Sequence, residues 1–138
     1  DFGDGESVPL GAISSPTTVA HFYSEDGVFQ VSVIGTDVDG GSAQAAGSVG
    51  VIPITFSVTS SKSAEVVNVP FLFTVSGIPA GVPINRYIWD FGDGQGQTTT
   101  TPTASHAYQA PGLKTITVTV VPRYGESRTA SFQVLVNP

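Results

Sequence analysis

The chain has 138 residues, of which 40% are hydrophobic and only 12% are charged, and it contains neither cysteine nor methionine. This composition excludes a disulfide framework and thiolate metal sites, and no apolar run approaches the roughly 20 residues of a membrane-spanning helix, so we expect no membrane insertion. The net charge is −6, and its negative charge is gathered in residues 1–53, which carry seven carboxylates and no Lys or Arg, whereas residues 54–138 carry four carboxylates and five basic side chains. Nothing in the sequence would neutralise a phosphate backbone, so nucleic acid is not an expected partner.

The N-terminal stretch contains two short strings that recur later in the chain. Asp1-Phe2-Gly3-Asp4-Gly5 is repeated at residues 90–94, 89 residues further on, and His21-Phe22-Tyr23 is matched by the His-x-Tyr string at residues 106–108, 85 residues further on. Further matches follow at the same spacing of 85, from Gly27 to Pro53. The four-residue slip falls between the two strings, where a loop would absorb it. We therefore predict an internal repeat.

The repeat spacing also predicts the domain boundaries. The second copy spans residues 54–138 and is complete, whereas residues 1–53 are only the C-terminal portion of a truncated first copy, because nothing in them corresponds to residues 54–89. A sandwich that lacks two or three strands exposes unpaired edges and half of its core. Either the missing strands belong to a longer polypeptide, which is the simpler interpretation, or another chain donates them.

Apolar residues alternate with polar ones through the second copy, which is typical of strands with one buried face. Five such runs are expected, at residues 54–58, 67–75, 87–91, 116–120 and 132–136. Pro70 inside the second run predicts an edge strand or a bulge, and the Thr-rich residues 98–101 predict an extended loop or an edge strand. No segment has useful helical periodicity, so the expected fold is an all-β sandwich.

The third run leads into Trp89-Asp90-Phe91-Gly92-Asp93-Gly94, which is followed by His106-Ala107-Tyr108 and by Gly112 at the start of the next run. This ordered set resembles the PKD (polycystic kidney disease) domain, whose hallmark is a WDFGDG motif with a downstream H-x-Y. The resemblance covers residues 54–138 and, through Asp1–Gly5, His21 and Tyr23, residues 1–53. It implies immunoglobulin-like, PKD-type β-sandwiches in tandem, which usually serve as spacer, adhesion or accessory modules in extracellular regions.

Each motif residue has a structural interpretation. Trp89 and Phe91 lie two residues apart on one strand face, where they can fill the space between two sheets. Gly92 and Gly94 permit backbone conformations with positive φ, and Asp93 can accept hydrogen bonds from amides in the turn. Tyr108 has the placement of a tyrosine that ties a sandwich corner to the backbone.

His21 and His106 are the only histidines, and a catalytic interpretation would pair one of them with Asp90 or Ser105. Because both histidines occupy the same repeat position, a structural hydrogen bond is the better interpretation. The sequence has no G-x-S-x-G elbow and no concentrated nucleophile–base constellation. We therefore expect a protein that is not an enzyme.

Carboxylates are the one feature that could hold a cofactor. Asp37 and Asp39, in the hairpin of the first copy, could bind calcium together with backbone carbonyls, but calcium takes six to eight oxygens and the EF-hand spacing is absent. Turn chemistry explains such Asp-Gly pairs without a metal. The prediction is no cofactor, with calcium at this loop as the minor alternative.

Two functions follow from the resemblance. The first is a structural or adhesive module that spaces, stiffens or decorates an assembly on a cell or virus-particle surface, where its partners would be other protein chains or surface polysaccharide. The second is the accessory region of a secreted hydrolase, where it would aid contact with the substrate. A catalytic site grafted onto the loops is a distant third.

Overall fold

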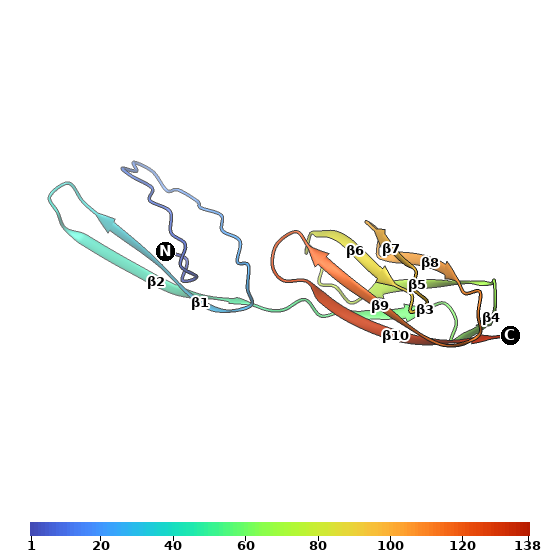
Figure 1. Ribbon diagram of the computed structural model, residues 1–138. Helices are drawn as coiled ribbons and strands as arrows, with labels where there is room; N and C mark the ends of the chain where they lie inside the picture. The colour runs from blue at the N-terminus through green and yellow to red at the C-terminus, as the bar shows by residue number, and fades with distance from the viewer. The chain divides into compact units, whose positions relative to one another are not determined.

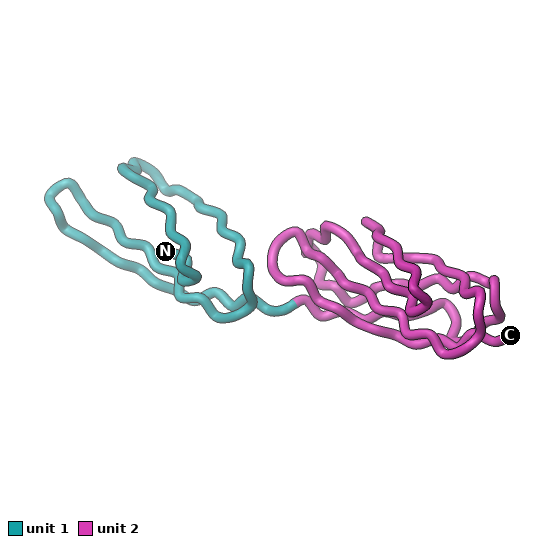
Figure 2. Tube along the Cα trace, in the orientation of Figure 1, with its two compact units in different colours: residues 1–53 teal, residues 54–138 magenta.

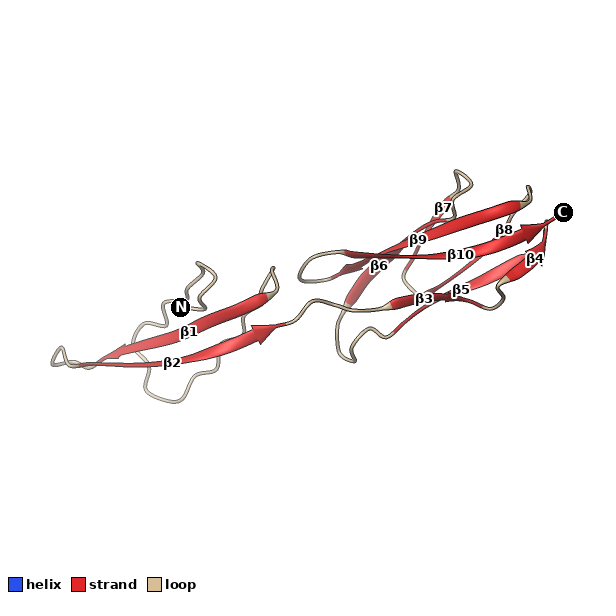
Figure 3. Ribbon diagram, turned by 90° about the horizontal axis from the view of Figure 1, so that it is seen from below, coloured by secondary structure: helices blue, strands red, loops and turns tan.

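The computed structural model describes residues 1–138, and these divide into two compact units, Asp1–Pro53 (unit 1) and Ile54–Pro138 (unit 2), shown in teal and magenta in Figure 2. All of the regular structure is β-strand (Figure 3). The expected all-β class is therefore confirmed. There is no helix of the length and apolarity needed to cross a membrane.

Unit 1 contains one β-hairpin. β1 (Gly27–Thr36) pairs antiparallel with β2 (Ser42–Val51) along its whole length, so that Gly27 faces Val51 and Thr36 faces Ser42 (Figure 1). Residues 1–26 form no strand. No side chain of unit 1 is fully buried.

Unit 2 is a sandwich of two sheets that enclose one core. Five strands form the first sheet in the order β4-β10-β9-β6-β7, and three form the second in the order β3-β5-β8. The strands are β3 (Ser57–Ser60), β4 (Ala64–Val66), β5 (Pro70–Ser76), β6 (Ile84–Asp90), β7 (Gly96–Thr99), β8 (Thr103–Ala107), β9 (Gly112–Pro122) and β10 (Arg128–Asn137). All neighbours pair antiparallel except β4 and β10, which pair parallel.

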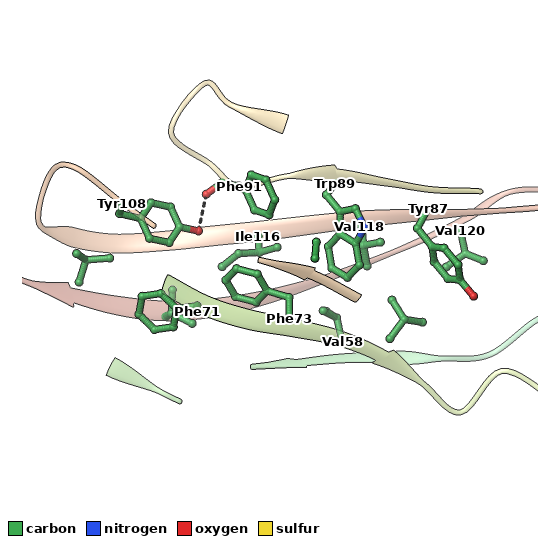
Figure 4. Close-up of a cluster of buried hydrophobic side chains, with 14 residues drawn as sticks. Val58, Phe71, Phe73, Tyr87, Trp89, Phe91, Tyr108, Ile116, Val118 and Val120 are labelled. Carbon is green, nitrogen blue, oxygen red and sulfur yellow. Dashed lines mark hydrogen bonds between the residues drawn. The ribbon is translucent and has the colours of Figure 1, made fainter. Parts of the chain in front are cut away.

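The core lies between the two sheets, as the alternation of apolar residues requires. Phe71 and Phe73 enter it from β5, Trp89 from β6, and Ile116 and Val118 from β9, and each is at most 1% exposed (Figure 4). No polar or charged residue is buried with them. Burial of these large side chains supplies the main driving force for folding of unit 2.

Two expectations about the second run are wrong. Residues 67–75 do not form a single strand, because Asn68 has a φ of 66° and turns the chain from β4 in the five-stranded sheet to β5 in the other. β5 lies between β3 and β8, so Pro70 is on neither an edge strand nor a bulge. Proline is tolerated there because it is the first residue of its strand.

The first expected run is shorter than its apolar alternation suggested. β3 begins at Ser57, although Phe56 packs against the core from the preceding segment. The Thr-rich stretch, by contrast, begins within a strand: Thr98 and Thr99 end β7 at the edge of the five-stranded sheet, in agreement with the expected edge strand, and residues 100–101 follow it. Alternation thus identifies the buried face better than it identifies the ends of a strand.

Candidate functional site

The DFGDG segment of unit 2 forms a tight turn just after β6. Asp90 Oδ1 accepts a hydrogen bond from the Gly92 amide at 2.8 Å, and Asp93 Oδ1 accepts one from the Gln95 amide at 3.1 Å. The Phe91 amide closes the turn by donating to the Gln95 carbonyl at 3.0 Å. Both carboxylates therefore act as local acceptors for backbone amides that would otherwise be unpaired.

His106, at the end of β8, holds this turn from the other sheet. Its Nε2–H donates to Asp93 Oδ2 at 2.7 Å, and its ring stacks on Phe91 with a centroid distance of 4.1 Å and an interplanar angle of 2°. The partner of the histidine is thus Asp93 rather than Asp90. Partial burial opposes ionisation of Asp93, but the hydrogen bonds from His106 and from the Gln95 amide outweigh it, so the pKa of this carboxyl lies below its ordinary value of 3.8.

Tyr108 joins the turn to the core. Its hydroxyl donates to the Phe91 carbonyl oxygen at 2.9 Å (Figure 4). Its ring is 1% exposed and packs edge-on against His106 and Phe71. Burial, assisted by the charges of Asp93 and Asp90, raises the pKa of Tyr108, so the hydroxyl stays a donor at physiological pH. We call Asp90, Phe91, Asp93, His106 and Tyr108 the DFGDG cluster of unit 2.

Trp89 is anchored by a residue that the sequence analysis did not single out. Its indole Nε1–H donates to Thr99 Oγ1 at 3.0 Å, and Thr99 in turn donates to the Thr101 carbonyl at 2.7 Å. A buried indole N–H needs a hydrogen-bond acceptor, and the hydroxyl groups of the Thr-rich stretch are candidates that the sequence offers for it. The choice of Thr99 among four consecutive threonines depends on the pairing of β6 with β7.

Gly92 is required both by its conformation and by its surroundings. Its φ is +71°, and a Cβ atom at this position would collide with the carbonyl oxygen of Thr115 on β9. Gly94 also has a positive φ, of +86°, but faces open space. The first glycine of the motif therefore lets the turn lie against the sheet, whereas the second serves only the turn itself.

Unit 1 repeats this geometry contact by contact. His21 Nε2–H donates to Asp4 Oδ2 at 2.6 Å, the His21 ring stacks on Phe2 at 3.9 Å, and the Tyr23 hydroxyl donates to the Phe2 carbonyl oxygen at 3.0 Å. Asp1 Oδ1 accepts from the Gly3 amide at 2.7 Å, and a Cβ on Gly3 would collide with the backbone of Gln30 on β1. These residues, Asp1, Phe2, Asp4, His21 and Tyr23, form the DFGDG cluster of unit 1.

The two clusters differ in what covers the adjoining hairpin. Val33 and Val49 of unit 1 are 57% and 40% exposed, whereas Val118 and Val134, 85 residues further on, are 0% and 1% exposed. A shallow groove of about 250 Å³ lies over this part of unit 1 and is lined by Val31, Val33 and Val49. The clusters are alike, but only unit 2 has a core beside its cluster.

Asp37 and Asp39 lie in the turn between β1 and β2. Asp37 Oδ1 accepts hydrogen bonds from the amides of Asp39 and Gly41 at 3.0 and 2.7 Å. One carboxylate oxygen of the pair is thus engaged in holding the turn, as the Asp-Gly pattern suggests. No third acidic or histidine side chain joins them to make a metal-binding group. The absence of a cofactor stays the prediction, with calcium at this loop as its minor alternative.

Together, the contacts of each DFGDG cluster hold the DFGDG turn against the neighbouring β-strands. The histidine, both aspartates and the tyrosine of each cluster are engaged with one another or with backbone groups of the turn. The histidine–aspartate and tyrosine–carbonyl bonds contribute rigidity, because they join residues 13 to 21 positions apart in the sequence, whereas the aspartate–amide bonds are local to the turn. Unit 2 has two packed sheets whose strands are almost all antiparallel, and the Tyr108 hydroxyl ties a corner between strands to the backbone. These features define unit 2 as an immunoglobulin-like β-sandwich.

Comparison with known proteins assigns this immunoglobulin-like β-sandwich to a family. The PKD domain family matches residues 51–136, which is more than half of the chain, and the chain belongs to this family. The PKD resemblance expected from the motif is therefore confirmed for unit 2. PKD domains are non-catalytic domain types that occur typically in extracellular proteins. No curated protein matches the chain.

Solved structures agree on the fold. One is described as carbohydrate-binding modules with promiscuous specificity from the β-sandwich superfamily, and it is 31% identical to this chain with a TM-score of 0.55. The match covers 59% of this chain and 33% of the solved one, so this chain spans about a third of the length of the solved chain. The PKD1 domain of the Vibrio cholerae metalloprotease PrtV is 22% identical, with a TM-score of 0.52 and coverage of 63% and 100%. The PKD domain of the human receptor SorCS2 is 20% identical, with a TM-score of 0.50 and coverage of 92% and 96%.

Proposed function

We propose that the chain is a non-catalytic module that spaces, stiffens or decorates an extracellular assembly, at the surface of a cell or of a virus particle. The observation that carries this proposal is the use of the motif side chains. In unit 2 the only histidine is bonded to Asp93 and stacked on Phe91, and Tyr108 is bonded to a backbone carbonyl. Groups engaged in this way give a rigid building block rather than a reactive centre.

Residues 1–53 are proposed to be the C-terminal portion of a second PKD-like domain, in tandem with the complete domain of residues 54–138. The support is the correspondence of hydrogen bonds between the two DFGDG clusters, including the pairs His21–Asp4 and His106–Asp93. Repetition of a module suits a role as a spacer, since length is gained by adding copies.

Polysaccharide is a second candidate partner, and other chains of the assembly are the first. The similarity at 31% identity to a structure described as carbohydrate-binding modules favours polysaccharide. Such contact would suit the alternative role, the accessory region of a secreted hydrolase that helps the enzyme to meet its substrate. The outer faces of unit 2 offer hydroxyl and amide groups, among them Thr117, Ser131 and Gln133.

Two measurements test these functions. Immunogold labelling of cells or particles that carry the chain should place it on their outer surface; label confined to the cell interior would remove the extracellular proposal. Pull-down of the purified chain on insoluble cellulose, chitin and xylan tests the alternative. Retention that is competed by the matching soluble oligosaccharide would favour the accessory role, and no retention on any of them would count against it.

A further inference from the structure

The outward face of the β9–β10 hairpin in unit 2 carries no charged side chain along its middle. Alternate residues of both strands enter the core, among them Ile116 and Val134. Lys114 lies on that inner side too, with its ammonium over the Tyr108 ring. The outward positions between them hold only hydroxyl and amide groups: Thr115, Thr117, Thr119, Thr129, Ser131 and Gln133. Protein surfaces are ordinarily rich in lysine and glutamate, so this face is exceptional in being neutral.

Two rows of these side chains are bonded across the strands. Gln133 Nε2 donates to Thr115 Oγ1 at 3.1 Å. The hydroxyls of Thr119 and Thr129 share a hydrogen bond at 3.0 Å. These bonds hold the side chains in one geometry, so a ligand that lies across them costs less side-chain entropy than it would on unpaired side chains. The two rows are therefore preorganised for contact with a polar ligand.

The row between these two ends on a carboxylate. Ser131 lies opposite Thr117, and Thr117 lies opposite Asp90 of β6. We call these three residues the central row. Asp90 Oδ1 accepts from the Gly92 amide at 2.8 Å, whereas Oδ2 and the two hydroxyls of the row have no hydrogen-bond partner. Neighbouring strands are about 4.8 Å apart, so the row offers two hydroxyls and one carboxylate oxygen along a line of about 10 Å.

Exposed apolar side chains border the polar rows on the same face. Ile88 of β6 lies opposite Thr119 and is 40% exposed. Leu113 and Leu135 lie opposite one another towards the other end of β9 and are 64% and 45% exposed. A sugar ring has hydroxyl groups around its edge and C–H groups on its two faces. It therefore binds where polar and apolar groups lie side by side, as they do on this face.

We propose that the outward face of β10, β9 and β6 binds an extended neutral polysaccharide, whose hydroxyl groups donate to Asp90 Oδ2 and bond to the hydroxyls of the central row. The proposal rests on the proposed contact with polysaccharide, and it names the surface and the class of polymer. Charge decides the class, because the carboxylate of the central row accepts from hydroxyl groups and repels uronate, sulfate and phosphate groups. Arg86 lies opposite Val121, outside the hydroxyl rows.

Unit 1 holds a poorer version of the central row. The Ser32 amide donates to the Asp1 carbonyl at 2.9 Å, and Ser32 lies opposite Ala46 in the β1–β2 pair. Ala46 stands 85 residues before Ser131 and brings no hydroxyl to the row. We therefore expect weaker binding at this hairpin, which serves as an internal comparison within the same sample.

The test titrates the ¹⁵N-labelled full chain with cellohexaose, xylohexaose and chitohexaose and follows the amide resonances by nuclear magnetic resonance. The expected result is saturable shifts at Thr117 and Ser131 with at least one of these neutral probes, larger than those at Ser32 and Ala46. The amides of β3, β5 and β8 should not shift. Trigalacturonate, which is anionic, should bind at least about tenfold more weakly.

Paired substitutions test the face itself. Thr117→Val with Ser131→Ala removes both unpaired hydroxyls at little change of volume and should weaken binding about tenfold. The matched control is Thr59→Val with Ser105→Ala, at outward positions of the three-stranded sheet, and should bind like the unchanged chain. The resonance of the Trp89 indole N–H reports in every sample whether unit 2 is folded.

Four outcomes would overturn the proposal. Shifts confined to the other sheet, or binding undiminished by the Thr117 and Ser131 substitutions, would place the polysaccharide elsewhere and leave the proposed polysaccharide contact standing. Tighter binding of trigalacturonate would contradict the neutral class. Shifts of the central row that grow with protein concentration alone would assign the face to a second copy of the chain. Silence of every amide, together with no retention on the insoluble polymers, would remove the polysaccharide contact as well, whereas surface labelling tests the structural role independently.

Discussion

The two units place the same cluster in different surroundings. In both, a histidine donates to the second aspartate of DFGDG, stacks on the phenylalanine, and is followed by a tyrosine that donates to the carbonyl of that phenylalanine. In unit 2 this tyrosine is 1% exposed, whereas in unit 1 no side chain is fully buried. The local contacts therefore do not depend on a closed core.

The difference in burial between the two units indicates which contacts stabilise the fold most. Hydrogen bonds at a turn contribute modestly, because unfolding replaces them with bonds to water. Apolar burial contributes more, and here it is concentrated in unit 2. We therefore expect mutations of corresponding residues to have large effects in unit 2 and small ones in unit 1.

The largest effect is expected at Trp89, which has no counterpart in unit 1. Trp89→Ala removes the largest buried side chain and should lower the free energy of unfolding of unit 2 by about 3–5 kcal/mol, measured by urea denaturation followed by circular dichroism. The neighbouring Ile88→Ala is the control, because Ile88 is 40% exposed. Equal losses for the two variants would contradict a core centred on Trp89.

Substitutions at Gly92 and Gly94 distinguish the cost of a steric collision from the cost of a positive φ. Gly92→Ala should cost about 3 kcal/mol, since the methyl group meets the Thr115 carbonyl in addition to the strain of a positive φ. Gly94→Ala should cost about 1–2 kcal/mol, for conformation alone. Thermal melting of both variants measures the difference, and a more damaging change at Gly94 would show that the turn does not lie against β9 as described.

The corner tyrosines compare the two units directly. Tyr108→Phe leaves the Phe91 carbonyl without its donor in a buried setting and should cost about 1–2 kcal/mol in urea denaturation. Tyr23→Phe removes the same bond from a half-buried residue and should change stability by less than about 0.5 kcal/mol. Similar losses at both positions would mean that unit 1 is as well covered as unit 2.

The acid limb of the stability profile tests the Asp93–His106 pair. Because the pKa of Asp93 is lower in the folded protein than its ordinary 3.8, the pair stabilises unit 2 above that pH, and the stabilisation is lost as the pH falls through the folded pKa. Asp93→Asn should reduce the loss of melting temperature between pH 5 and pH 2. An unchanged acid limb would show that the pair does not contribute. The hydrogen bond from His21 lowers the pKa of Asp4 in the same direction.

The smallest effect is expected from calcium. Asp37 already accepts two amide hydrogen bonds within the turn, so millimolar calcium should leave the melting temperature of the chain unchanged. A rise that is abolished by Asp37→Asn and Asp39→Asn together would instead establish the calcium site of this loop. The hairpin loop of unit 2, Arg123–Glu126, has one carboxylate and serves as the internal comparison.

Much of the site could be predicted from the sequence because its contacts are short in range or fixed by the motif. The Asp-Gly turns, the positive φ of Gly92 and Gly94, and a bonded rather than free histidine follow from residue chemistry. The choice of Asp93 over Asp90 as its partner does not, because it depends on where β8 meets the turn. Thr99 was missed for the same reason, since only the pairing of β6 with β7 brings it to Trp89.

Alternation and the motif predicted the all-β class, the PKD family and the buried face of each main strand, because both are properties of neighbouring residues. The tertiary structure was needed to show that residues 67–75 change sheet at Asn68 and that Pro70 begins a central strand, since strand pairing joins distant segments. It also decided that equivalent valines are buried in one unit and exposed in the other. Burial requires a covering layer, and no residue carries that layer with it.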